Sequence, residues 1–336
     1  MDKEEEEGEG EQFFNYCKDG KVRKVQQLLK NNSQINLNYQ NEIGETGFFI
    51  ACQFGHIKVV KALVKDNRVD VTKASAEGET PFWVACYKGL IDIVKLLLKD
   101  GRIDVNKPDA DGTTPFNVAC QEERIEAIKL LLNDERINRN QANVNGQTPL
   151  YLACRKGSLQ VVIRLLNDKK IETNRATNDG SIPLYVSCCY GHIEIVKLLL
   201  NDQRIEVNKV NCDGQTSLYI ACENGHIGVV KLLLNDQRVD VNRAEDESGR
   251  TPFLIACEKG YLEIVQYFLA SGRDVNGKGA IDIARKAGRL EIIELLKSFE
   301  SCPNVIKAKL KKQFGLYGKI IYFDCLFFYL FNSLEL

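Results

Sequence analysis

A nine-residue segment recurs along the chain at an almost constant spacing, and this spacing constrains the fold more than any other feature of the sequence. The copies read GETGFFIAC, GETPFWVAC, GTTPFNVAC, GQTPLYLAC, GSIPLYVSC, GQTSLYIAC and GRTPFLIAC, and their starts are 34, 34, 34, 34, 34 and 35 residues apart. A length of 336 residues would otherwise suggest two or three domains. A fixed period of this length instead indicates a linear array of similar units.

Each unit is predicted to contain two short helices. In the second helix, Ile193, Val196 and Leu199 recur at the spacing of an amphipathic stripe. In the first helix, a threonine before a proline offers a capping hydroxyl, and a glycine about eight residues later permits a left-handed turn. A two-turn helix is unstable alone, so the units need their neighbours. We expect the fastest hydrogen exchange in the units that lack one of these residues, at Gly47, Ile182 and Ser217.

These residues resemble the ankyrin repeat, whose pattern G-x-TPLHxAAxxGHxEVVxLLL…DVN is matched almost unit by unit over residues 13–300. The resemblance implies an all-α solenoid of stacked helix pairs with β-hairpin-like loops, about seven full 34-residue repeats and two capping repeats, and a surface that binds other proteins. We therefore divide the chain into a disordered acidic tail, an array and a C-terminal tail. The ranges are 1–12, 13–300 (N-cap 13–43, full repeats 44–276, C-cap 277–300) and 301–336.

The chain departs from the ankyrin pattern in two ways. The histidine of TPLH is replaced throughout, for example by Trp83 and Asn117, so we expect apolar packing in place of the usual Thr–His hydrogen bond. One residue is also added after the second helix, within an Asp-x-Arg motif. We expect this motif to form ion pairs between repeats, with an anion site as the alternative. The motif occurs at Asp66/Arg68, Asp100/Arg102, Asp134/Arg136, Asp202/Arg204 and Asp236/Arg238, with Lys170 replacing arginine in one unit.

The chain carries no recognisable catalytic or ligand-binding motif. Eight of the twelve cysteines occupy one repeat position, and adjacent repeats stack at about 10 Å, too far for a disulfide, so we expect buried free thiols. The acidic start has no secretory signal, which favours a reducing, cytoplasmic location. Cys188, Cys189 and His192 form the one local group of metal-ligand types, and the three histidines occupy a turn position. We expect no enzyme activity, no cofactor and no metal.

Acidic and aromatic residues gather at the loop tips and just after each AC motif, where partners of ankyrin repeats usually bind. We interpret this face as a binding surface for a basic or basic-aromatic protein segment; an acidic surface with no partner is the alternative. The net charge of -1 does not favour nucleic acid, and we expect a monomer. The residues of the hypothesis are Glu45, Phe54, Glu79, Tyr87, Asp111, Glu122, Asp179, Tyr190, Asp213, Glu223 and Glu258.

Residues 301–336 break the repeat, with lysines followed by an apolar aromatic run. The run at 320–331 contains Asp324 and is too short to span a membrane, which needs about 20 residues. Three interpretations remain: the tail packs on the last repeat, inserts at a membrane interface, or is an unstructured or truncated end of a longer product. The leading function is a non-catalytic adaptor or scaffold. The alternative is a membrane-tethered or regulatory subunit that the tail targets, and an enzyme whose catalytic domain is missing here is least favoured.

Overall fold

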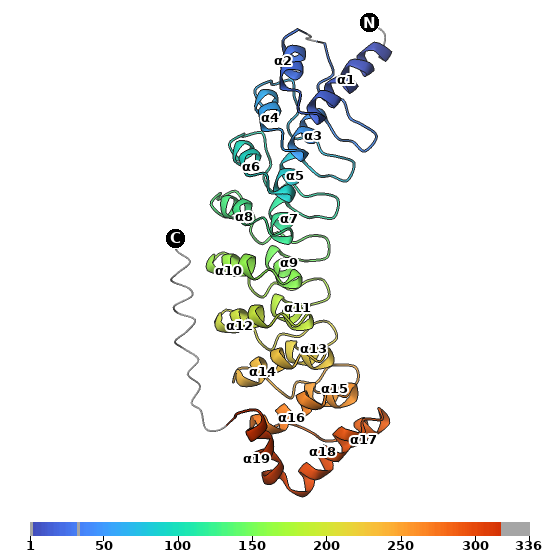
Figure 1. The fold of residues 1–336 in the computed structure, drawn as a ribbon, viewed down its shortest axis with the longest axis vertical. Helices are drawn as coiled ribbons and strands as arrows, with labels where there is room; N and C mark the ends of the chain where they lie inside the picture. Colours follow the sequence, from blue (N-terminus) through green and yellow to red (C-terminus); the bar gives the residue numbers. More distant parts are fainter. Residues whose placement is uncertain (1–2, 32–33, 317–336) are drawn as a thin grey trace. The chain divides into compact units, whose positions relative to one another are not determined.

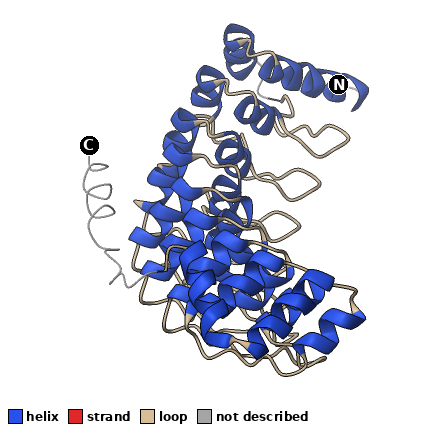
Figure 2. Cartoon of the chain, turned by 60° about the horizontal axis from the view of Figure 1, so that its bottom comes forward, coloured by secondary structure: helices blue, strands red, loops and turns tan. Residues whose placement is uncertain are grey.

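The computed structural model describes residues 3–31 and 34–316. Within these ranges the regular elements are all helices, arranged as pairs, and Figures 1 and 2 show the helices joined by turns and long loops. The chain divides into an N-terminal unit, Met1–Ile205, and a C-terminal unit, Glu206–Leu336. The predicted all-α ankyrin-type fold is confirmed in both units.

In the N-terminal unit, the first helices of successive repeats stack on one another and the second helices form a parallel row. The loops leave the row of first helices on the side opposite the second helices (Figure 1). The first helices are α1 (Lys3–Lys18), α3 (Gly47–Gln53), α5 (Pro81–Lys88), α7 (Pro115–Gln121), α9 (Pro149–Lys156) and α11 (Pro183–Cys189). The second helices are α2 (Val22–Asn31), α4 (Ile57–Leu63), α6 (Ile91–Leu98), α8 (Ile125–Leu132), α10 (Leu159–Asn167) and α12 (Ile193–Asn201).

The C-terminal unit repeats this arrangement and adds one helix. Its first helices are α13 (Ser217–Glu223), α15 (Pro252–Lys259) and α17 (Ala280–Lys286), and its second helices are α14 (Ile227–Asn235), α16 (Leu262–Ser271) and α18 (Leu290–Ser301). The additional helix α19 (Pro303–Gln313) packs against α16 and α18. Phe314 meets the ring of Tyr267 edge-on at 5.2 Å, and Leu310 is buried. Up to residue 316, the tail therefore packs on the last repeats, while the run 320–331 lies outside the described residues.

The first helices begin and end as the sequence predicts. The Thr80 hydroxyl accepts a hydrogen bond from the backbone N–H of Trp83 at 3.0 Å, and equivalent caps form at Thr46, Thr114, Thr148, Thr216 and Thr251. Ile182 makes no side-chain cap. Gly89 and Gly157 end their helices in the left-handed conformation. Local capping therefore sets the two-turn length of these helices.

The repeated cysteine position lies in the core of each repeat. Cys17, Cys52, Cys86, Cys120, Cys154, Cys188, Cys222 and Cys257 are buried, and none of the cysteines in the described ranges forms a disulfide. Burial raises the pKa of the Cys154 thiol to about 12. These thiols stay protonated at neutral pH and act as small apolar side chains, as predicted.

The Asp-x-Arg motif forms its ion pair within one loop rather than between repeats. Arg102 Nη2 lies 2.6 Å from Asp100 Oδ2, and the hydrogen bond from Arg102 holds the pKa of Asp100 below its usual value. The same guanidinium nitrogen donates to the Val64 carbonyl of the preceding repeat at 2.9 Å. The prediction of ion pairs between repeats is thus wrong. The arginine binds the aspartate of its own loop and the free carbonyl at the end of the second helix of the preceding repeat.

Asparagine side chains join successive loops in place of a β-sheet. Asn106 Nδ2 donates to the Arg136 carbonyl at 2.7 Å, and Asn106 Oδ1 accepts from the Asn138 N–H at 2.8 Å. One amide therefore satisfies two backbone groups of the next loop. We call each such bridge an asparagine rung; Asn38, Asn140, Asn208 and Asn242 form equivalent rungs.

Two residues at the position of the missing TPLH histidine still make polar contacts to the next loop. Trp83 Nε1 donates to the Thr113 carbonyl at 2.8 Å, and Asn117 Nδ2 donates to the Gln141 carbonyl at 3.1 Å. The Thr114 hydroxyl also donates to Asn117 Oδ1 at 2.8 Å. The expectation of apolar packing is therefore wrong for these two units, because a buried loop carbonyl needs a donor.

The acidic segment at the start of the chain differs from the expected disordered tail. Helix α1 begins at Lys3, so residues 3–12 are helical and continuous with the first helix of the N-terminal cap. Glutamate has a high helix propensity, and negative charge in the first turns interacts favourably with the helix dipole. Phe13 and Phe14 bury the end of this segment against the array.

We predict that Glu123→Gly stabilises the protein by about 1 kcal/mol. Glu123 has a φ of 57° and is the one non-glycine residue with positive φ in the part of the chain that the structure describes. The neighbouring repeats have Gly89 and Gly157 at this turn, where a Cβ adds strain. Urea unfolding measures the gain. Glu123→Ala keeps the Cβ and removes the charge, so an equal gain in that control would assign the effect to charge and contradict the backbone explanation.

Candidate protein-binding surface

The loop tips of the N-terminal unit are held in a fixed row. Within a tip, the Ser75 N–H donates to the Glu79 carbonyl at 2.9 Å, and between tips the Ala110 N–H donates to the Glu77 carbonyl at 2.8 Å. At Gly78, which has a φ of 81°, a Cβ would lie 2.9 Å from the Ala110 nitrogen. The tips therefore pack backbone against backbone, and their outward side chains form one continuous edge.

Four carboxylates lie at two neighbouring tips of this row, and we call them the acidic cluster: Glu77, Glu79, Asp109 and Asp111. Burial raises the pKa of Glu79, and the nearby charges of Glu77 and Asp109 raise it further. Burial also raises the pKa of Asp109, with Asp111 and Glu77 contributing. None of the four makes an ion pair within the described ranges. The cluster is therefore a concentrated negative charge that the protein itself leaves largely uncompensated.

Glu45 lies beside the cluster but turns toward its own loop. Its side chain is buried, and Oε2 accepts a hydrogen bond from Asn41 Nδ2 at 2.9 Å. The charge of Glu45 contributes to the raised pKa of Glu79. Glu45 therefore adds negative charge near the cluster, but its buried side chain is not available to contact a partner protein.

Other acidic residues of the sequence hypothesis have partners within the protein. Glu122 lies 3.7 Å from Lys156 Nζ, Glu223 lies 3.5 Å from Lys259 Nζ, and Glu258 lies 2.5 Å from Arg250 Nε. Lys156 and Lys259 belong to the following repeat, whereas Arg250 belongs to the same repeat as Glu258. The negative face is consequently uneven, with its uncompensated part at the acidic cluster.

Asp179 and Asp213 lie at later loop tips and accept local hydrogen bonds. The Ser181 hydroxyl donates to Asp179 Oδ2 at 2.9 Å, and Asn211 Nδ2 lies 3.3 Å from Asp213 Oδ2. Burial opposes ionisation of Asp179, but the hydrogen bonds from Thr177 and Ser181 together lower its pKa. Asp213, Glu223 and Glu258 belong to the C-terminal unit, whereas the acidic cluster belongs to the N-terminal unit.

The three predicted aromatic residues have different exposures. Phe54 and Tyr190 are 55% and 56% exposed, and each stacks on the histidine two residues later. Tyr87 is half-buried and stacks on Trp83, with ring centroids 5.5 Å apart. Lys88 Nζ lies 5.0 Å from the Tyr87 ring centroid and is also close enough to lower the pKa of Glu79. Tyr87 and the acidic cluster are therefore neighbours on one surface.

The structure thus brings together five residues of this surface. Glu79, Tyr87 and Asp111 belong to the contact residues of the sequence hypothesis, and Glu77 and Asp109 are two further acids of the same predicted face. Glu77 and Asp109 are recognised in the sequence by their place at the loop tips, two residues before Glu79 and Asp111. Their importance depends on mutual repulsion across neighbouring loops, which requires the stacked geometry.

A comparison with protein families agrees with the stacked helix pairs of the fold. A family model described as ankyrin repeats, with three copies per model, matches residues 13–109, 101–177, 169–245 and 237–306. The chain belongs to the ankyrin-repeat family. Ankyrin repeats are generally protein–protein interaction modules. The matches extend past the predicted boundary at 300 into α19. A comparison with curated proteins finds no match.

Two further features of the described residues bear on function. No helix in the ranges 3–31 and 34–316 is long and apolar enough to cross a membrane. The same residues contain no group of three or more side chains suited to hold a metal ion, so Cys188, Cys189 and His192 do not assemble into such a group there.

Proposed function

We propose that this ankyrin-repeat protein is a non-catalytic adaptor or scaffold that binds a basic segment of a partner protein at the acidic cluster. The observation that carries the proposal is the raised pKa of Glu79 and Asp109 in a group of four carboxylates without an ion pair in the described part of the chain. Holding these charges together costs free energy, and a bound cation relieves that cost.

The neighbouring aromatic pair supports a basic-aromatic ligand. Lys88 already lies over the ring of Tyr87, and this contact is one that an arginine or lysine of a partner can also make. The Trp83–Tyr87 stack provides apolar area beside the carboxylates. A segment with alternating basic and aromatic residues therefore matches both parts of the surface.

The test is a fluorescence anisotropy titration of the full chain with a labelled peptide of alternating arginine and tyrosine. We expect Glu77→Lys, Glu79→Lys and Asp111→Lys together to weaken binding at least about tenfold. Asp109 is left unchanged because it accepts a hydrogen bond from the Thr113 N–H at 2.8 Å and so shapes the loop. The matched control reverses Glu194, Glu291 and Glu300, which are exposed on other helices.

Equal weakening by the control would indicate attraction by net charge alone and would contradict the proposed surface. A second contrast is pH. Because the pKa values of Glu79 and Asp109 are raised above 4.5 and 3.8, their charge is lost at a higher pH than for ordinary carboxylates. Peptide binding favours the ionised forms, so affinity should fall as the pH drops through this raised range. The triple variant keeps only Asp109 of the cluster, so its dependence on pH should be weaker.

A further inference from the structure

One asparagine rung is missing from the array. The rung position carries asparagine in seven loops but threonine at Thr72. The Thr72 hydroxyl donates to Asp70 Oδ1 at 2.7 Å, within its own loop, and so does not reach the next loop. The asparagines are Asn38, Asn106, Asn140, Asn174, Asn208, Asn242 and, in the last loop, Asn276.

The backbone groups that the missing side chain would satisfy stay open. By the spacing of the other rungs, these are the carbonyl of Arg102 and the N–H of Asp104. In the rung one repeat later, the corresponding bonds from Asn106 measure 2.7 and 2.8 Å. Neither the Arg102 carbonyl nor the Asp104 N–H makes a hydrogen bond in the described part of the chain. An acceptor and a donor thus lie two residues apart on one loop segment.

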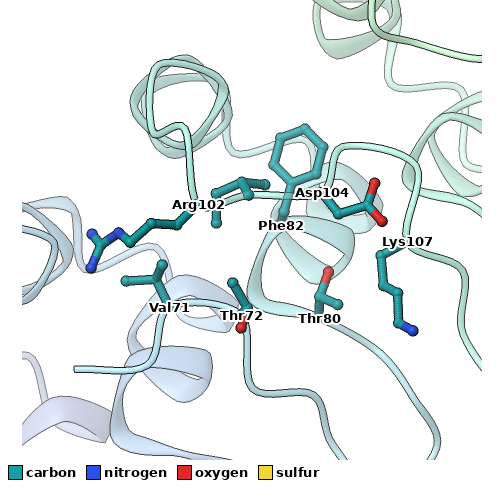
Figure 3. A pocket seen from close by; sticks show the side chains of 8 residues that line it. Val71, Thr72, Thr80, Phe82, Arg102, Asp104 and Lys107 are labelled. Atoms are coloured by element: carbon teal, nitrogen blue, oxygen red, sulfur yellow. The ribbon is translucent and has the colours of Figure 1, made fainter. Parts of the chain in front are cut away.

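A cavity of about 290 Å³ opens at this place. Buried Val71, Phe82 and Ile103 form its apolar part, while Thr72, Arg102 and Asp104 contribute polar groups, and Lys107 lies at its side (Figure 3). The Arg102 guanidinium is already bound to Asp100 and the Val64 carbonyl. The cavity therefore combines apolar walls with a few convergent polar groups, the usual composition of a small-ligand site.

We propose that this cavity binds a primary carboxamide, from either a small molecule or an asparagine or glutamine side chain of a partner protein. A carboxamide places one N–H donor and one C=O acceptor as the asparagine rungs do, and so pairs with both open backbone groups at once. An ionised carboxylate has no donor and would leave the Arg102 carbonyl unsatisfied. Because Arg102 and Asp104 are exposed, the carboxylate forgoes one hydrogen bond that the amide makes, and the site favours the amide over the acid by that bond.

The test uses isobutyramide, a carboxamide with a small apolar group, titrated into the full chain while the backbone amide resonances are followed by NMR. We expect a saturable shift of the Asp104 amide. Thr72→Asn supplies the missing rung from within the protein, so it should abolish that shift and raise the melting temperature. Thr72→Ser keeps the cavity open and is the matched control, which should bind as the unchanged protein does.

Further probes separate the ligand chemistry and its source. Isobutyric acid should bind about threefold more weakly than isobutyramide, because it loses the hydrogen bond to the Arg102 carbonyl. A blocked Gly-Asn-Gly peptide with an N-methylamide end should shift the Asp104 amide if the cavity accepts a protein side chain, and its Gly-Asp-Gly counterpart should not. Binding of isobutyramide without the Asn peptide assigns the site to small molecules.

Three results would overturn the proposal. The first is no shift of the Asp104 amide with either isobutyramide or the asparagine peptide. The second is binding by Thr72→Asn equal to that of Thr72→Ser, which would place the ligand elsewhere. The third is equal or tighter binding of the acid, which would show that Lys107 and not the open backbone pair governs recognition. A lowered melting temperature for Thr72→Asn would likewise contradict the rung geometry.

Discussion

Arg139→Val is expected to lower the free energy of unfolding by about 2 kcal/mol, even though valine is the residue that most repeats have at this position. Arg139 is only 7% exposed. Its Nε lies 3.1 Å from Asp168 Oδ2, and its Nη2 donates to the Leu132 carbonyl at 2.8 Å. Removing one partner of a buried pair leaves the other charge uncompensated, which costs more than the added apolar contact returns.

The next repeat explains why an arginine is buried at position 139. In most loops the aspartate after the second helix pairs with an arginine two residues on, but the loop of Asp168 has Lys170 instead. Lys170 Nζ turns to Glu135 Oε2 at 2.6 Å. Asp168, the residue after helix α10, therefore pairs with an arginine of the preceding repeat. The unusual residues Arg139 and Lys170 compensate for each other.

Lys170→Arg should restore most of the stability that Arg139→Val removes, because an arginine at 170 can pair with Asp168 as Arg136 pairs with Asp134. Urea unfolding of the two single variants and the double variant measures the coupling. Arg175→Val is the control: its ion pair with Glu172 spans 3.6 Å and is exposed, so little change is expected. Additive effects of the two substitutions would contradict the compensation.

Gly47→Pro is expected to destabilise the protein by about 3 kcal/mol, although proline begins most of the equivalent helices. Gly47 is the first residue of α3 and is buried. A Cβ there would lie 2.9 Å from Phe13 Cε1 and 3.1 Å from Cys17 Sγ. Because Phe13 and Cys17 belong to α1, the proline should also loosen the N-terminal cap, which faster hydrogen exchange in α1 would reveal.

Ser217→Pro, at the same position of α13, should instead stabilise the protein. The Ser217 hydroxyl is buried and has no hydrogen-bond partner in the part of the chain that the structure describes. Proline removes that group and suits the first position of a helix, so we expect a gain of about 1 kcal/mol. Thermal unfolding of both variants checks the contrast. A stabilising Gly47→Pro would refute the packing explanation.

Gly47 also shows where reasoning from local sequence stops. From the repeat pattern alone, a glycine in place of proline is a weak point. In the structure it provides the space in which the cap residue Phe13 packs. Ile182, by contrast, lacks its cap in the structure as the pattern predicts. Capping depends on residues within one turn, whereas packing depends on a residue 34 positions away.

In the loops, too, the sequence pattern is visible but the contacts of each side chain are not. The Asp-x-Arg motif was evident as a pattern, but the direction of the arginine toward the preceding helix end was not. The acidic residues of the predicted face are equally evident in the sequence, but their ion-pair partners are not. Glu122 pairs with Lys156, whereas Glu79 lies near other carboxylates that raise its pKa. Side chains of similar sequence context differ because their neighbours come from the next repeat.

By itself, the sequence determined the period, the helix pairs with their caps, the buried cysteine row and the family, because each of these repeats within about 34 residues and is set by local physical chemistry. Only the tertiary structure decided which carboxylates repel one another, which arginine serves which aspartate, and that the threonine at position 72 leaves two backbone groups open beside a cavity. Those outcomes depend on groups that approach within a few ångströms only when the repeats stack.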